Sequence, residues 1–485
     1  MYTVTFLPAG ISVEVEAGTS LLSAQISAGL RPDAPCGGKG ICGKCRVTVN
    51  GDSVLACSTA VRQDMTVILP EQHDAEILSA EADVSDADGQ HRYAIAFDIG
   101  TTTLVGFLLS GTSGELLASA SIVNPQTQFG ADVISRIQTA VSEKEPLLRR
   151  CITDALCSLI EKLTVKADIP TNEIGTVCAV GNTAMHHLFL GIDPSPLITP
   201  PYMPKVLEAL ETPAVEFLPI LPNASLRVLP NIAGFVGADT VSCMVATKLD
   251  TLTDNTLLID IGTNGEMVLC SRGHRFACSV AAGPAFEGAR ISQGMRGSTG
   301  AIDHVWLEKN EIRFHVLGES EPVGICGSGL LDLVACLLDA GIIDEAERLK
   351  SKQFTFSGTT VTLTQKDVRE VQLAKGAIRA GIELMCRQAG IAPHEICTVL
   401  LAGAFGNYMT PRSACRIGMI PPCLLGKIRP VGNAAGEGAK QCAVNRNKFE
   451  HAKTVAVATE FLELASLPNF QDQFVSALDF REPLD

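Results

Sequence analysis

The chain has 485 residues, of which 46% are apolar, and its formal net charge is −15 at pH 7. This length allows roughly three domains, and the apolar content is sufficient to build their cores. The negative charge argues against a nucleic-acid partner, because a phosphate backbone binds basic surfaces.

Neither a signal peptide nor a membrane span is expected. No basic segment precedes an apolar one at the N-terminus, and acidic residues interrupt the longest apolar runs before about 18 residues. The 17 cysteines are odd in number and lack the spacing of a disulfide scaffold, which favours a reducing compartment such as that of an anaerobe. The composition therefore predicts a soluble, cytoplasmic protein.

Residues 1–70 predict a small sheet crossed by one helix. Polar and apolar residues alternate over 3–6 and 11–15, on either side of a Pro-Ala-Gly turn, as in a β-hairpin. A short helix follows, capped by Thr19 or Ser20 and ended by Gly29. Asn50-Gly51-Asp52 predicts a second hairpin, and residues 65–69 predict a last strand.

A glycine-rich loop in this region carries three cysteines in C-x5-C-x2-C spacing, and a fourth cysteine follows. The four are Cys36, Cys42, Cys45 and Cys57. Four thiolates are the ligand set of a 2Fe-2S cluster, and the intervening glycines leave room for the backbone to wrap an inorganic core. A zinc site with four cysteine ligands is the alternative, but zinc fingers favour two matched C-x2-4-C pairs. The spacing therefore favours the cluster.

Residues 71–92 are polar and acidic, with little apolar periodicity. We interpret them as a solvated linker that lets the N-terminal domain swing relative to the rest of the chain. The predicted organisation is therefore a domain over 1–70, a linker over 71–92 and a body over 93–485, with the halves of the body at 93–254 and 255–485.

The body is built around a repeated motif. The segment AIAFDIGTTTLVGFLL at 94–109 returns as TLLIDIGTNGEMVL at 256–269, and each copy predicts a strand, a tight turn and a second strand. Glycine lets backbone N–H groups approach an anion, threonine hydroxyls donate hydrogen bonds, and Asp98 and Asp260 can hold a Mg²⁺ shell. One copy alone would indicate only a hairpin, whereas two copies favour a nucleotide site. The predicted phosphate-binding residues are Gly100, Thr101, Thr102, Thr103, Gly262, Thr263, Asn264 and Gly265.

Further segments of the body add candidates for this site. Glu266 and Glu287 are acids near the predicted nucleotide; either could orient the attacking water or hold a magnesium-bound water, and a solvated carboxylate is the alternative. The run Gly327-Ser328-Gly329 opens a helix whose N-terminus predicts an anion site. A helix is expected over 231–247, and its glycines could serve either tight packing or ligand approach. Neighbouring His186 and His187 should point to different faces of one helix, so we expect no metal pair there.

The paired motifs resemble the two phosphate loops of the actin-like ATPase superfamily. Residues 398–409, TVLLAGAFGNYM, resemble its adenosine motif, which implies that Gly403 and Gly406 lie against the nucleotide. Residues 177–190 and 324–338 resemble its two connecting segments, at which the halves hinge. Because residues 1–70 resemble the β-grasp ferredoxins, the implied fold is a β-grasp 2Fe-2S domain followed by a duplicated, ribonuclease-H-like α/β ATPase.

This combination of domains is similar to the reductive activators of corrinoid proteins, which return Co(II) corrinoid to Co(I) at the expense of ATP. The runs NPQTQFGADVISRI at 124–137, AGPAFEGA at 282–289 and LLAGAFGNYM at 400–409 match that family. The resemblance implies a 2Fe-2S cluster, ATP and Mg²⁺ as cofactors, with Asp98, Asp260 and Glu266 in the ATPase centre. It also implies a corrinoid protein of a methyltransferase or demethylase system as partner, a low-potential electron donor, and a homodimer as one possible state.

Two other function classes stay open at this point. A small-molecule kinase of the acetate and sugar kinase type would use the same loops but has no need for the four cysteines. A redox-sensing ATPase regulator would keep both modules without any corrinoid acceptor.

Overall fold

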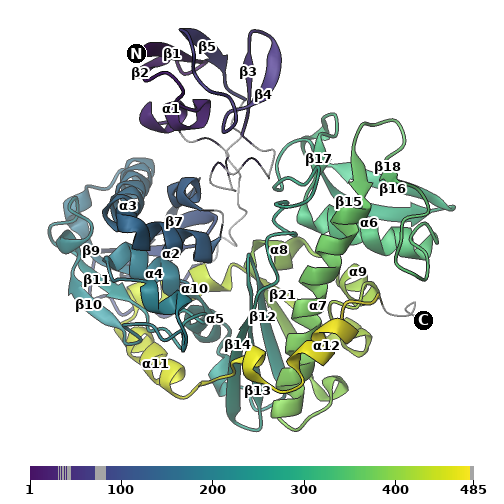
Figure 1. Ribbon diagram of the computed structural model, residues 1–485. Coiled ribbons are helices and arrows are strands. Elements are labelled where there is room, and N and C mark those ends of the chain that lie inside the picture. Colours follow the sequence, from purple (N-terminus) through teal and green to yellow (C-terminus); the bar gives the residue numbers. More distant parts are fainter. Residues whose placement is uncertain are drawn as a thin grey trace.

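The computed structural model describes residues 1–30, 32, 34, 38, 40, 45–70, 83–130 and 132–480. Figure 1 shows a small N-terminal sheet and a larger body made of two halves. No helix within these ranges is both long enough and apolar enough to cross a bilayer.

The N-terminal domain is a five-stranded mixed sheet with one helix. Its strands follow the order β2-β1-β5-β3-β4, in which β1 and β5 run parallel and the other neighbours run antiparallel. The elements are β1 (Tyr2–Leu7), β2 (Ile11–Val15), α1 (Leu21–Ser27), β3 (Arg46–Val49), β4 (Asp52–Leu55) and β5 (Met65–Ile68). Ser20 caps α1 by accepting a hydrogen bond from the Ser23 backbone N–H at 3.1 Å. Both predicted hairpins and the helix are confirmed, and the domain has its own apolar core around Val4, Phe6 and Val67.

The first half of the body is a six-stranded sheet with the order β10-β11-β9-β6-β7-β8. Its strands are β6 (Tyr93–Ile99), β7 (Thr103–Ser110), β8 (Leu116–Val123), β9 (Ile174–Gly181), β10 (Leu210–Pro213) and β11 (Ser225–Val228). Its helices are α2 (Val133–Thr139), α3 (Glu145–Ala167), α4 (Thr183–Leu190) and α5 (Ala238–Thr247). Along β6, Ile95 and Phe97 face a core shared with α3, while Ala94 and Ala96 face a core shared with α5. This alternation is the period of two expected of a strand that is covered on both faces.

The second half repeats this plan in a sheet with the order β21-β20-β12-β13-β14-β22. Its strands are β12 (Thr256–Ile261), β13 (Gly265–Ser271), β14 (His274–Val280), β20 (Thr398–Ala402), β21 (Ile428–Gly432) and β22 (Glu460–Phe461). Its helices are α7 (Gln365–Gln388), α8 (Gly403–Tyr408), α9 (Pro411–Arg416), α10 (Ala434–Val444), α11 (Arg446–Val457) and α12 (Phe470–Ser476). A smaller layer inserted after β14 contains β15 (Ala301–Glu308), β16 (Glu311–Val316), β17 (Gly324–Ile325), α6 (Gly327–Asp339), β18 (Gln353–Thr355) and β19 (Thr362–Thr364).

The internal repeat predicted from the sequence is confirmed by the strand pairing. In each half an antiparallel meander of three strands, β6-β7-β8 or β12-β13-β14, is extended by two parallel strands on the side of its first strand. Helices α5 and α10 lie between the two sheets and pack against each other, with a shared core that reaches from Ala96 to Leu258. Figure 1 shows α10, late in the sequence, beside the first-half sheet. The two phosphate loops lie close together, since Thr102 of one and Thr263 of the other both donate to Glu287.

The acidic segment before the body departs from the prediction. We expected all of 71–92 to be solvated, but the part from Asp83 onward is fixed to the body. Val84 is 5% exposed, and its backbone N–H donates to the Gly114 carbonyl at 2.8 Å. Asp88 bonds the turn between α10 and α11, where its carboxylate accepts from the Arg446 backbone N–H at 2.7 Å. Residues 71–82 of the predicted linker lie outside the described residues.

The predicted helix over 231–247 begins only at Ala238. Gly237 precedes it because a Cβ there would lie 2.5 Å from the Cα of Asn182, and a Cβ at Gly234 would lie 2.2 Å from the carbonyl oxygen of Tyr202. Tight backbone packing therefore explains both glycines.

Candidate functional site

The two predicted phosphate loops are tight turns at equivalent ends of the two meanders. The backbone N–H of Gly100 donates to the Thr103 carbonyl at 3.0 Å, and that of Gly262 donates to the Asn264 carbonyl at 2.9 Å. A Cβ at Gly100 would lie 2.7 Å from the Thr103 oxygen, so the first turn requires glycine. At Gly262 the nearest atom would be 3.8 Å away, and its φ is not in the left-handed region. Packing within the protein does not demand glycine there, which fits the close approach of a ligand.

Carboxylates gather behind the two loops. Asp98 ends β6 and Asp260 ends β12, where Asp260 is paired in register with Glu266 on β13. The pKa of Asp98 is raised to about 6, mainly by burial and also by the charge of Asp260, while a hydrogen bond from Asn433 Nδ2 at 3.0 Å opposes the shift. Burial likewise raises the pKa of Asp260 to about 6. Burial and the charges of Asp239 and Asp260 raise the pKa of Glu266.

Asp239 is an acid of this group that sequence reasoning missed. It lies in the first turn of α5, and the Thr240 backbone N–H donates to it at 2.7 Å. Burial raises its pKa to about 7, and the charges of Asp260 and Asp98 add to the shift. Like charges close to one another raise the pKa of each carboxyl, and a bound cation would oppose that shift. Among the described residues, no three His, Cys, Asp or Glu side chains are grouped so that they could hold a metal ion by themselves. Mg²⁺ usually binds one or two carboxylates together with phosphates and waters.

Three side chains hold the first phosphate loop: Asn124 follows β8, Arg136 belongs to α2, and Asn182 caps α4. Asn124 Nδ2 donates to the Gly100 carbonyl at 2.8 Å, and Asn182 Nδ2 donates to the Thr101 hydroxyl at 2.9 Å. The Arg136 guanidinium, which is fully buried, donates to the carbonyls of Thr101 and Gly130. Sequence reasoning missed these three, although the motif at 124–137 contains two of them.

The hydroxyls of Thr102 and Thr263, one from each loop, donate to the same carboxylate. Thr102 donates to Glu287 Oε2 at 3.1 Å, and Thr263 donates to both Glu287 oxygens at 3.1 Å. Glu287 thus joins a loop of the first half to a loop of the second half. Thr103 and Gly265 open β7 and β13, so they contribute to the turns through their backbone.

In the segment predicted to carry the adenosine motif, α8 begins at Gly403, which lies next to the Asp260 carboxylate. Gly403 has φ +84°, and a Cβ there would lie 2.5 Å from Asp260 Oδ1, so the chain requires glycine at this position. At Gly406 a Cβ would make only ordinary contacts, the nearest at 3.4 Å to Leu401. Packing within the protein therefore does not require glycine at position 406, and contact of Gly406 with the nucleotide stays a prediction.

The structure gives the glycines of Gly327-Ser328-Gly329 a packing role. A Cβ at Gly327 would lie 2.0 Å from the Phe286 carbonyl oxygen, and one at Gly329 would lie 2.2 Å from the Ile302 carbonyl oxygen. Ser328 is 5% exposed, and its hydroxyl is 3.4 Å from Cys326 Sγ. Anion binding at this helix end stays a prediction.

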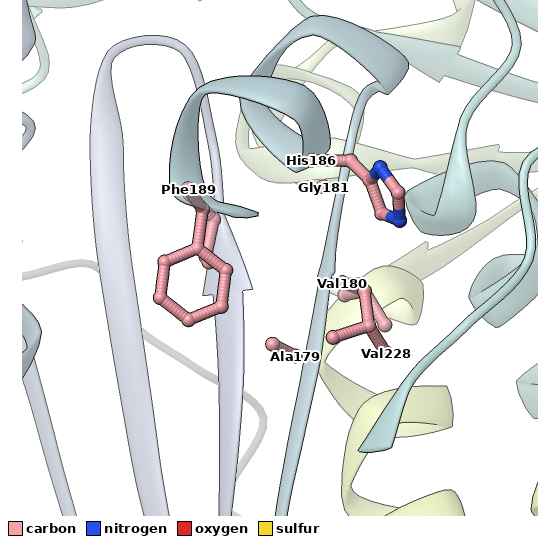
Figure 2. A pocket seen from close by; sticks show the side chains of 7 residues that line it. Ala179, Val180, Gly181, His186, Phe189 and Val228 are labelled. Atoms are coloured by element: carbon pink, nitrogen blue, oxygen red, sulfur yellow. The ribbon is translucent and has the colours of Figure 1, made fainter. Parts of the chain in front are cut away.

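The two histidines of α4 do not diverge as expected, since their Nδ1 atoms lie 3.4 Å apart. His187 is fixed by the Thr183 carbonyl and by the Lys205 backbone N–H, which donates to its Nε2 at 3.2 Å. His186 Nε2 is buried and has no hydrogen-bond partner among the described residues. It borders a cavity of about 10 Å³ between the ends of β6 and β9, which has room for one water at most (Figure 2).

His186 is expected to make the protein sensitive to mild acid. Burial lowers its pKa to about 3, whereas the unfolded chain takes up the proton near pH 6.5. The folded state therefore loses stability as the pH falls below about 6.5, by up to about 1.4 kcal/mol per pH unit from this residue. His186→Leu should flatten the dependence of the free energy of unfolding on pH between 7 and 5, measured by urea denaturation. His394→Leu, at an exposed position, is the control; equal slopes in the two variants would contradict the assignment.

Of the four predicted cluster cysteines, Cys45 and Cys57 are described, while Cys36 and Cys42 lie outside the described residues. The Ala56 backbone N–H donates to the Cys45 carbonyl at 2.7 Å, which places Cys57 beside the strand that Cys45 precedes. Gly38 has φ +82°, and its Cβ would lie 3.8 Å from the Cβ of Cys57. Gly38, which lies between Cys36 and Cys42 in the sequence, is therefore close to Cys57, as expected if Cys57 belongs to the same cluster site.

Comparison with known proteins covers both modules. Residues 4–67 match a family described as 2Fe-2S iron-sulfur cluster binding domain, residues 93–252 match the RACo middle region, and residues 254–483 match the C-terminal ASKHA domain of RACo. The fold predicted from the sequence, an N-terminal ferredoxin domain and an actin-like ATPase domain, is therefore confirmed.

Individual relatives agree with these matches. The corrinoid activation enzyme RamQ of Eubacterium limosum is 36% identical over 413 residues, which are 79% of this chain and 69% of RamQ. The [Co(II) methylated amine-specific corrinoid protein] reductase of Methanosarcina barkeri is 26% identical over 80% of this chain and 77% of its own length. A solved structure titled reductive activator for corrinoid,iron-sulfur protein superposes with a TM-score of 0.73 and 29% identity, covering 99% of this chain and 98% of that one. With this domain order and these relatives, the chain belongs to the RACo family of corrinoid-activating proteins.

Proposed function

We propose that this protein reductively activates a corrinoid protein, passing one electron to Co(II) corrinoid to give Co(I) and coupling the transfer to ATP hydrolysis. The observation that supports this most is the presence, in one chain, of a 2Fe-2S binding domain and of two predicted phosphate loops that meet at Glu287. A kinase of the sugar or acetate type has no use for the first module. The solved structure titled reductive activator for corrinoid,iron-sulfur protein covers 99% of this chain, so its match includes both modules.

A requirement for ATP follows from the energetics of the transfer. Every 59 mV of unfavourable one-electron potential is a factor of ten in the equilibrium. A donor roughly 0.2 V above the cobalt couple therefore faces three to four decades, or about 5 kcal/mol. Coupling between binding sites usually supplies about 1 to 3 kcal/mol, so binding alone falls short and hydrolysis must contribute.

In this proposal the carboxylates of Asp98 and Asp260 hold Mg²⁺ jointly with the nucleotide phosphates. Thr101, Thr102 and Thr263 donate hydroxyl hydrogens to the phosphates, and backbone N–H groups of both loops complete the cradle. The space beside Gly262 would admit a phosphate close to the backbone, and Gly403 and Gly406 are the proposed contacts of the adenosine. Glu266 orients the attacking water or holds a magnesium-bound one.

Cys36, Cys42, Cys45 and Cys57 are the proposed ligands of the 2Fe-2S cluster, which supplies the single electron when it is bound. We also propose the cytoplasm as the location, a corrinoid protein of a methyltransferase or demethylase system as the acceptor, and a low-potential protein as the donor. The proposed division of the chain is 1–70, 71–92 and 93–485, with 83–92 fixed to the body.

The proposed reaction is tested by following Co(I) absorbance under anaerobic conditions with a candidate corrinoid protein. The mixture contains the full chain, ATP, Mg²⁺ and a chemical reductant, and the expected result is Co(I) formation that requires all of them. Co(I) formation at an equal rate without ATP, or phosphoryl transfer to a small-molecule acceptor, would contradict the proposal.

The cluster assignment makes its own prediction. Anaerobically purified protein should contain about two iron atoms and two acid-labile sulfides, with a rhombic electron paramagnetic signal after reduction. Cys57→Ala should lose this signal, because one iron of the cluster would then lack one of its two cysteine ligands. Cys397→Ala, an exposed cysteine of the body, is the matched control and should keep it. Stoichiometric zinc without sulfide would show that the site is a zinc site.

A further inference from the structure

The structure assigns to Glu287 a role in distinguishing ATP from ADP: its carboxylate competes with the terminal phosphate for the hydroxyls of Thr102 and Thr263. This inference rests on the proposed ATP site and adds a specificity-determining residue to it. Sequence reasoning left Glu287 as one of two acids without a defined role.

The geometry leaves the two hydroxyls no spare hydrogen. A threonine hydroxyl has a single O–H to donate. The donors at Thr102 and Thr263 are both directed to Glu287, at 3.1 Å in each case. A phosphate oxygen that takes these donors must displace the carboxylate from them.

The Glu287 carboxylate lies between the two loops, which is where the inference places the terminal phosphate. Thr102 belongs to the loop of the first half and Thr263 to the loop of the second half, so a group that contacts both lies between the loops. Glu287 Oε1 is also the atom nearest to a Cβ built at Gly262, at 3.8 Å. A carboxylate and a phosphate in this space repel each other as like charges.

Glu287 is held in place by its own segment and not by the threonines alone. Its backbone N–H donates to the Pro284 carbonyl at 3.2 Å. Gly288 follows with φ +78°, where a Cβ would lie 2.5 Å from the Met295 carbonyl oxygen. The tight turn around Glu287 therefore aims the carboxylate between the loops.

The same segment touches the predicted adenosine motif. Phe286 is 4% exposed and stacks on Phe405 of α8, with ring centroids 4.8 Å apart and planes at 12°. Displacement of Glu287 by a phosphate thus acts on a turn that is packed against α8. Nucleotides that lack the terminal phosphate leave the hydroxyls of Thr102 and Thr263 on Glu287.

The test compares the affinities of AMPPNP and ADP, each with Mg²⁺, for the full-length protein and its variants by isothermal titration calorimetry. Glu287→Gln keeps the shape but removes the charge, so the ratio of AMPPNP to ADP affinity should rise by about tenfold or more. Glu287→Ala should change the ratio in the same direction, because it frees both hydroxyls. Glu308→Gln removes an exposed charge on β15 and is the matched control, with an unchanged ratio.

A ratio that stays within about twofold of wild type, or that falls, in either folded variant would overturn the inference. A fall would mean that Glu287 helps to hold Mg²⁺ against the phosphate. Failure of the wild-type protein to bind either nucleotide would instead refute the proposed ATP site, so the two failures are distinguishable.

Discussion

Asp260→Ala and Asp98→Ala are each expected to lower the rate of ATP hydrolysis by about three orders of magnitude while the N-terminal cluster stays intact. Both side chains lie at strand ends behind the phosphate loops, and their pKa values are raised to about 6 by burial. For both carboxyls, the hydrogen bonds from Asn433 and Cys243 do not offset the cost of burying the charged form. In the proposed site Mg²⁺ would offset that cost, and each variant would lose a carboxylate that holds the ion.

Steady-state phosphate release measures this effect, and visible absorbance reports the cluster. Asp254→Ala removes an exposed carboxylate just before the same strand β12 and should leave the rate unchanged. Because the removal of acids that raise one another's pKa relieves repulsion, neither active-site variant should unfold at a lower urea concentration. Wild-type hydrolysis in both variants would show that the two loops are only hairpins.

Much of this arrangement was predictable because it is local in sequence. The repeated motif at 94–109 and 256–269 contains both strands of each hairpin and an aspartate near the end of the first strand. Once the two strands pair, this aspartate necessarily lies next to the turn. Strands covered on both faces read as nearly continuous apolar runs, which made β6 and β12 recognisable.

The rest of the site depends on contacts between distant segments. Asp239 reaches Asp98 and Asp260 only because Gly237 allows the start of α5 to pack against the start of α4. Glu287 lies 185 residues from Thr102, and nothing in the spacing of the chain indicates that they meet. The one signal was the motif AGPAFEGA itself, whose glycine at 288 holds the turn.

The acidic linker was mispredicted over its last ten residues for a related reason. Composition shows that the segment has few apolar residues, but one valine and a series of backbone hydrogen bonds suffice to fix it. Val84 enters the core shared by the two halves, and the Asp88 carboxylate accepts from the Arg446 backbone N–H at the start of α11. Low hydrophobicity alone therefore does not show whether a polar segment binds to a neighbouring surface.

Cutting the chain between Pro70 and Asp83 is expected to lower corrinoid activation by about a thousandfold at micromolar protein. Each part has its own sheet and core, so both should fold: the ferredoxin domain around Val4 and Phe6, and the body with Val84 still docked. A tether of 12 residues reaches at most about 40 Å, shorter than the full predicted linker would allow, and it keeps the domains at about millimolar effective concentration. Separate micromolar parts meet only by diffusion.

The assay follows Co(I) absorbance with ATP, Mg²⁺ and a chemical reductant, using both fragments at equal concentration. The rate should recover as the ferredoxin fragment is raised towards millimolar, because mass action then replaces the tether. Lengthening the linker with Gly and Ser residues, without a cut, is the matched control and should cost little, since effective concentration falls only slowly with length. If the body without any ferredoxin fragment activates the corrinoid protein at the intact rate, the cluster is not the electron donor, and a redox-sensing role for the N-terminal domain becomes the better explanation.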